Sequence, residues 1–92
     1  MKKITRILIA NRGEIAVRIM RTARKMGIET VAIRTAVEPD AMYLTFADII
    51  HDDNDELAEI PVFLDVEKLI GIALKTRCNA VPPGYVFMHN ND

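Results

Sequence analysis

Near its start the chain reads ITRILIANRG, residues 4–13, an apolar run that ends in a turn. The run predicts a strand over Ile4 to Ala10, because β-branched residues favour strands and an Asn-Arg-Gly sequence favours a turn. A helix is expected from about Gly13 to a stop at Gly27, which can adopt the left-handed conformation at a helix end. Its apolar stripe recurs at helical spacing, through Ile15, Ile19, Ala23 and Met26, with Ala16 and Met20 widening it.

The remaining segments continue the alternation of strand and helix. Residues 30–33, TVAI, are almost all apolar, as in a strand that helices cover on both faces. Further along, the pattern predicts a short helix at 40–46, begun by Pro39, a strand at 47–50, a helix at 66–77 capped by Asp65, and a strand at 79–81. We therefore predict a three-layer α/β domain with an open parallel Rossmann-like sheet in the order 3-2-1-4. The last strand is expected to be an edge with unpaired backbone groups.

Composition restricts the class of protein. The 92 residues, 50% hydrophobic and 27% charged with a net charge of -1, are typical of one small domain. The balanced charge argues against nucleic acid and membrane surfaces as partners. A lone Cys78 excludes an intramolecular disulfide, and no apolar run approaches the roughly 18 residues of a membrane span. The apolar stretch behind the basic N-terminus is too short for a signal peptide, so a cytoplasmic location is expected.

The turn after the first strand has the spacing of a dinucleotide-binding fingerprint. Asn11, Gly13 and Ala16 occupy its three positions, with Gly13 expected to let the backbone approach a neighbour closely. Glu14, however, places a negative charge where a pyrophosphate would lie. The alternative is an ordinary turn between strand and helix, and only a weak nucleotide-binding hypothesis remains.

Other polar groups have simple interpretations. Arg18, Arg21 and Lys25 share one helical face, which is typical of a solvated surface or of a subunit contact, and Glu14 can pair with Arg18. The acidic run at 51–56 lacks the alternating oxygens and glycine of a calcium loop and is interpreted as a solvated loop. Cys78 is expected to be a buried hydrophobe. We find no catalytic set of nucleophile, base and oxyanion donors, and predict no metal site.

Several stretches together point to a family. Residues 9–19, IANRGEIAVRI, closely resemble the opening of biotin carboxylases, the ATP-dependent component of acetyl-CoA, propionyl-CoA and pyruvate carboxylases. Residues 27–32, 63–68 and 83–85, together with Phe87, are similar to later parts of the same region. The resemblance extends from about Lys3 to Asn91.

This resemblance implies a role as part of a larger enzyme. Residues 1–92 would be the N-terminal domain that precedes an ATP-grasp module, without the family domain's last helix and fifth strand. The family's ATP, magnesium and bicarbonate ligands lie mostly in later domains. ATP, magnesium and biotin are therefore implied for the parent ligase, and no cofactor is expected on this chain alone. The implied partners are the ATP-grasp and C-terminal domains, a biotin carrier protein and a second copy of the chain.

The resemblance also assigns residues. The loop at 82–91 would face the biotin ureido ring, with Tyr85 beside the biotin, Gly84 holding the loop close and Phe87 within it. Arg18 and Arg21 match the helix that borders the dimer interface, and Lys25 lies on the same face. The loop departs from the family pattern at Pro82, Val86 and Asn90, where members usually carry histidine, glycine and glutamate. The alternative function is a non-catalytic subunit-interaction domain derived from that family.

Overall fold

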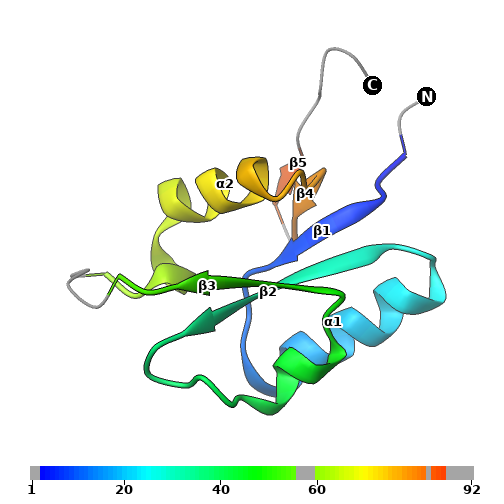
Figure 1. Cartoon of the computed structure of the whole chain (residues 1–92). Coiled ribbons are helices and arrows are strands. Elements are labelled where there is room, and N and C mark those ends of the chain that lie inside the picture. The colour runs from blue at the N-terminus through cyan, green and yellow to red at the C-terminus, as the bar shows by residue number, and fades with distance from the viewer. Residues whose placement is uncertain (1–2, 56–59, 83, 87–92) are drawn as a thin grey trace.

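The computed structural model describes residues 3–55, 60–82 and 84–86 and has two helical layers around one sheet (Figure 1). Helix α1 (Gly13–Lys25) and the 3₁₀ helix η1 (Met42–Phe46) cover one face. Helix α2 (Val66–Lys75) and the 3₁₀ helix η2 (Val62–Leu64) cover the other. The strands are β1 (Arg6–Ile9), β2 (Glu29–Thr35), β3 (Ile49–Asp53), β4 (Ala80–Val81) and β5 (Tyr85–Val86). Within the described residues, no helix is long and apolar enough to span a membrane.

The sheet has the order β3-β2-β1-β4-β5, and its first four strands are parallel. The predicted order 3-2-1-4 is therefore confirmed. The prediction of an unpaired last strand was wrong, because β5 runs antiparallel to β4, with Ala80 opposite Val86 and Val81 opposite Tyr85. After β4 the chain turns back, and β5 pairs with the edge of β4 whose backbone groups were predicted to be unpaired.

Two cores lie on opposite faces of the central strand β1. Ile7 and Ile9 point to the side of α1, whereas Leu8 points to the side of α2. This alternation follows from the two-residue period of a strand. Leu8 and Ile9 are 0% and 1% exposed, so β1 is buried on both faces, as the apolar run predicts.

The start and the end of α1 depend on two glycines with positive φ. Gly13 has a φ of +63° and Gly27 a φ of +74°, a region that residues with a Cβ avoid. Apart from its chain neighbours and its own helix backbone, no atom of the described residues lies within 4 Å of where a Cβ on Gly13 would stand. The expected close approach therefore has no neighbour within the described part of the domain, and the positive φ is the reason for glycine here. Beyond Gly27, the Ile28 amide donates to the Ala23 carbonyl at 2.9 Å, which completes a Schellman motif.

The buried stripe of α1 differs from the predicted one. Ala16, Met20 and Ala23 face the sheet and are buried, whereas Ile15 and Met26 are 59% and 68% exposed. Small alanine side chains allow the helix to lie close to the sheet, and the larger Ile15, Ile19 and Met26 line a groove on one flank of the helix. The apolar stripe is therefore wider than the face that the sheet covers.

Other element boundaries also moved. The helix predicted at 40–46 is the 3₁₀ helix η1, which begins at Met42 rather than after Pro39. The buried Tyr43 donates its hydroxyl to the Ile33 carbonyl at 2.8 Å and ties this short turn to β2. Strand β3 covers Ile49–Asp53, not 47–50, because it pairs with β2 in register over that whole length.

Helix α2 ends at Lys75, two residues earlier than predicted, in a second Schellman motif. The amide of Cys78 donates to the Ala73 carbonyl at 2.8 Å, and Arg77 adopts a φ of 61°. Arg77 is the one non-glycine residue with positive φ in the described part of the chain. A left-handed conformation at a residue with a Cβ costs about 1–2 kcal/mol.

Asn79 links the turn before β4 to the start of β1 by hydrogen bonds. Its Oδ1 accepts hydrogen bonds from the amides of Thr5 and Arg6 at 2.7 and 2.9 Å. The backbone amide of Asn79 donates to the Arg6 carbonyl at 2.7 Å. The Arg6 guanidinium donates to the Thr76 carbonyl at 2.9 Å. These bonds replace strand pairing where β4 is too short to provide it.

We expect Asn79→Ala to lower the free energy of unfolding by about 1–2 kcal/mol, because two backbone donors lose their acceptor. Asn79→Asp keeps an oxygen at the same position and serves as the matched control, with a loss of less than half as much. Urea titration followed by circular dichroism measures both. An alanine variant as stable as the wild type would show that these bonds contribute nothing net.

Arg77→Gly should raise the free energy of unfolding by about 1 kcal/mol, since glycine accepts the left-handed conformation that arginine holds at a cost. Lys75→Gly, within the last turn of α2, should lower it by a similar amount. Thermal unfolding of the two variants gives opposite shifts in Tm. A decrease for Arg77→Gly would contradict the strain at this position.

Burial raises the pKa of Tyr43 above its ordinary value of 10.0. The folded protein then keeps a proton that the unfolded chain releases, so this stabilisation is complete below pH 10 and is lost as the pH rises through the folded-state pKa. We expect the stability advantage of the wild type over Tyr43→Phe to shrink from pH 9 to pH 11. Urea titrations across that range measure it, and a constant difference would contradict the assignment.

Candidate functional site

The carboxyl edge of the sheet between β1 and β4 is the point at which the connections of the sheet diverge. The chain moves outward from β1 to β2 and β3 in one direction, and β4 then lies on the opposite side of β1. In open parallel sheets, ligands bind where the connections diverge in this way. The turn at 11–14 follows β1, and Pro82 and Gly84 follow β4, which pairs with β1 through Ile7 and Ala80.

Two of the predicted sets of residues therefore meet at one edge. Asn11, Arg12, Gly13 and Glu14 form the turn and first helical residues after β1, and Gly84 and Tyr85 belong to the hairpin after β4. Phe87, Asn90 and the side chain of Tyr85 lie outside the described residues. Val86, one of the departures from the family pattern, lies in β5, where a β-branched residue is favourable.

Arg12 connects this edge to the layer of α2. Its backbone is extended, with a φ of -121°, and its side chain makes no capping bond to α1. Instead the guanidinium carbon lies 5.4 Å from the centroid of the Phe63 ring, a cation–π arrangement. Glu14 is exposed in the first turn of α1, where its charge favours the helix dipole.

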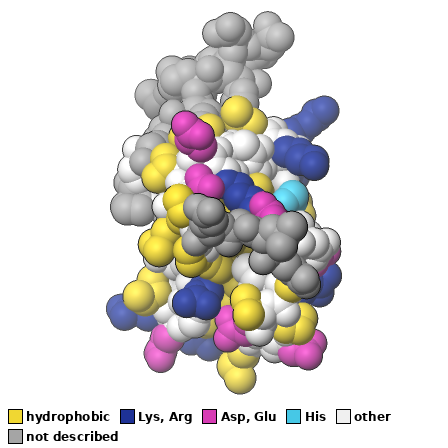
Figure 2. Space-filling view, turned by 90° about the vertical axis from the view of Figure 1, so that its left-hand side faces the viewer, with side chains coloured by type: hydrophobic (Ala, Val, Ile, Leu, Met, Phe, Trp, Pro, Cys, Tyr) yellow, Lys and Arg dark blue, Asp and Glu magenta, His cyan; other side chains and the backbone are white. Residues whose placement is uncertain are grey.

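A cleft of about 680 Å³ lies beside Arg12, on the face of the molecule toward which β1, β2 and β3 run (Figure 2). Its lining is mainly apolar and includes Val37, Ile60, Phe63 and Leu64. Among the described residues that line it, no nucleophile stands beside a base. A mainly apolar lining of this kind is suited to contact with another molecule.

The acidic run is more ordered than the predicted loop. His51, Asp52 and Asp53 belong to β3. Asp52 accepts two hydrogen bonds from the Arg34 guanidinium, which lower the pKa of the carboxyl and raise that of Arg34. The expectation of a solvated loop was wrong for these residues, because β3 continues through them alongside β2.

The same run also contacts α2. The Lys68 ammonium lies 2.9 Å from Asp53 and 3.4 Å from Asp55, and the bond to Asp53 is the main cause of its raised pKa. The acids thus attach β3 to its neighbours. No group of three potential metal ligands occurs in the parts of the chain that the structure describes.

Cys78 is fully buried in the core beside α2. Burial raises the pKa of its thiol, and a hydrogen-bond contact with the Thr76 hydroxyl at 3.3 Å offsets part of that effect. A protonated thiol without solvent access is a poor nucleophile. The interpretation of Cys78 as a small core residue is confirmed.

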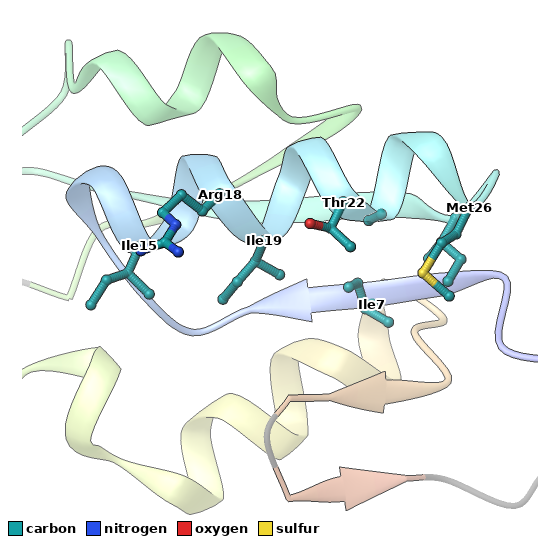
Figure 3. Close-up of a pocket in the computed structure, with 8 residues that line it drawn as sticks. Ile7, Ile15, Arg18, Ile19, Thr22 and Met26 are labelled. Atoms are coloured by element: carbon teal, nitrogen blue, oxygen red, sulfur yellow. The ribbon is translucent and has the colours of Figure 1, made fainter.

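The basic face of α1 is divided between two environments. Arg21 lies 5.4 Å from the centroid of the Phe46 ring, on the flank next to η1. Arg18 lies on the other flank, where it borders an apolar groove (Figure 3).

The predicted pair of Glu14 with Arg18 is wrong, since no ion pair joins these two described residues. Sequence reasoning missed the groove, although the excess width of the apolar stripe was a signal for it.

Comparison with known proteins identifies the family. Residues 3–92 match the model of the biotin carboxylase N-terminal domain. Over 88 residues the chain is 40% identical to the mitochondrial methylcrotonoyl-CoA carboxylase subunit alpha of Rattus norvegicus, covering 96% of this chain and 12% of that protein. It is also 40% identical over 88 residues to biotin carboxylase 1 of Bacillus subtilis, covering 96% of this chain and 19% of that protein.

Solved structures show the same fold. The pyruvate carboxylase of Rhizobium etli superposes with a TM-score of 0.77 at 34% identity, covering 91% of this chain and 9% of that one. The chain spans between 8% and 20% of the length of the curated relatives that it matches. The match of almost every residue to one family model shows that the chain belongs to the biotin carboxylase N-terminal domain family.

Proposed function

We propose that this chain acts as the N-terminal domain of an ATP-dependent, biotin-dependent carboxylase and shapes the biotin-side wall of its active site. The observation that carries the proposal is the meeting of two segments at the carboxyl edge of β1 and β4. One is the turn at 11–14, and the other is the hairpin that begins at Pro82. Segments far apart in sequence thus lie at the same edge of the sheet.

Each segment has a proposed role. We expect Gly84, Tyr85 and Phe87 to face the biotin ring, and this is supported by the pairing of β5 with β4, which sets the hairpin at the carboxyl edge of the sheet. The turn from Asn11 to Glu14 supports the wall from the side of β1. The chain contributes shape and water exclusion and supplies no acid, base or nucleophile. ATP, magnesium and biotin are bound by the complete enzyme, with none held by residues 1–92 alone.

The partners follow from the same role. We propose that the exposed side chains of Arg18, Arg21 and Lys25 face carboxylates of another subunit in a cytoplasmic, oligomeric carboxylase. The ATP-grasp and C-terminal domains and a biotin carrier protein complete the assembly.

A second candidate is a non-catalytic subunit-interaction domain. The observation that favours it is the exposed surface of α1, where Ile15 and Met26 are more than half exposed beside the exposed Arg18. Both candidates require docking to a larger protein, and only the first requires that docking to produce turnover.

Joining this chain to the rest of a carboxylase separates the two candidates. We expect a chimera, in which residues 3–92 replace the matching region of the Bacillus subtilis enzyme, to hydrolyse ATP in a manner that depends on bicarbonate and biotin. A Tyr85→Ala chimera should raise the KM for biotin several-fold while the KM for ATP stays unchanged, because only the biotin side is altered.

The controls are residues 3–92 alone and the Bacillus enzyme without the matching region, each of which should be inactive. A chimera that folds and assembles without biotin-dependent hydrolysis would favour the interaction domain. Turnover by the isolated chain would contradict both candidates.

A further inference from the structure

The contact between β3 and the layer of α2 changes in character along the strand. Ile49 and Asp53 lie on one face of β3, and the exposed Ile50 and Asp52 lie on the other. Ile49, at the start of the strand, packs against the core that contains α2. Asp53, at the end of the strand, instead lies 2.9 Å from the Lys68 ammonium. An apolar contact between the two layers is thus replaced by an ionic one at the carboxyl end of β3.

Lys68 binds one carboxylate at the end of β3 and another just beyond it. Its ammonium lies 2.9 Å from Asp53 and 3.4 Å from Asp55. The side chains of Lys68 and Asp53 are only 24% and 13% exposed, against 39% and 46% for Arg34 and Asp52. Water and salt therefore compete less with the Lys68 pair than with the pair inside the sheet. One side chain of α2 holds the place where the chain leaves β3.

The same network joins two sets of residues that line the cleft of about 680 Å³ (Figure 2). The two carboxylates belong to the first set, and residues 60–64, which include η2, form the second. Lys68 lies in the first turn of α2, which follows η2 in the chain. On the side of β1, the Phe63 ring of η2 contacts the Arg12 guanidinium. The position of η2 therefore depends on two contacts with cationic side chains, one of which reaches the end of β3.

An ion pair at this depth contributes position more than stability. Removing two charges from water costs free energy, and well-packed apolar residues in the same place are often at least as stable. An ionic contact also differs from an apolar one because dissolved ions weaken it. The end of β3 is thus joined to α2 by a contact that can open while the core around Ile49 stays packed.

We propose that Lys68, with Asp53 and Asp55, forms an ionic lock that sets the width of the cleft. When the lock is closed, η2 and the start of α2 are held toward the end of β3, and the cleft-lining Val62 is only 4% exposed. When the lock opens, η2 moves away from β3 and Val62 becomes accessible. This inference concerns the cleft beside Arg12 and is independent of the proposed function.

Thiol labelling measures the opening of the cleft. Val62→Cys introduces a thiol at the buried lining position, and the natural Cys78 in the same core is an internal reference for unfolding of the domain. Lys68→Ala should raise the rate at which a neutral maleimide labels the introduced thiol by about tenfold, because local opening no longer breaks the lock. The labelling rate of Cys78 should stay the same, and site-resolved mass spectrometry measures both rates.

Two control variants separate the lock from a general loss of charge. Lys75→Ala removes a lysine from the last turn of the same helix, which forms no ion pair in the described part of the chain, and should leave both labelling rates unchanged. Lys68→Arg keeps the positive charge and should keep the introduced thiol protected. Circular dichroism shows whether each variant remains folded.

Salt provides a test that needs no substitution at Lys68. Raising NaCl from about 0.1 to 1 M shortens the screening length from about 10 to 3 Å, so labelling of the introduced thiol should accelerate when Lys68 is present and not in Lys68→Ala. An unchanged rate at high salt with Lys68 present would overturn the proposal, and this arm decides the outcome if Lys68→Ala does not fold. Equal labelling of the introduced thiol with and without Lys68, or faster labelling of both thiols together, would also overturn it.

Discussion

The burial of β1 on both faces is the constraint on which the structure depends. Leu8 points into one core and Ile9 into the other, so helices must cover the sheet from both sides. Because β2 and β4 pair with opposite edges of β1, the connections diverge from this strand. The edge at which the connections diverge is therefore a consequence of the central position of β1 and does not require a dedicated set of polar residues.

Local backbone devices hold β1 in that position. Gly13 turns the chain from strand to helix, and Gly27 and Arg77 end the two helices in the left-handed conformation. Asn79 then binds the backbone at the start of β1. With β4 only two residues long, this side-chain link maintains the alignment of β4 with β1.

Several charged side chains form ion pairs within the domain. Arg34 pairs with Asp52, and Lys68 pairs with Asp53 and Asp55, so the acidic run stabilises the contact of β3 with its neighbours. Arg18 and the apolar groove beside it on α1 differ from these ion pairs, since they combine an exposed charge with exposed apolar surface. Both features are typical of a domain whose contribution is made within a larger assembly.

The sequence by itself determined the strand–helix alternation and the parallel order, because an apolar run, a turn and a helical stripe are local patterns that one topology satisfies. The family was indicated by the resemblance of residues 9–19 and later stretches to biotin carboxylases. The sequence also placed Asn11 to Glu14 at the turn between the first strand and the first helix. Tertiary structure alone decided the rotation of α1, the pairing of β5 with β4 and the extension of β3 through Asp53. Each depends on contacts between distant segments, and residue periodicity does not encode how closely a helix packs on a sheet or which edge a short strand joins.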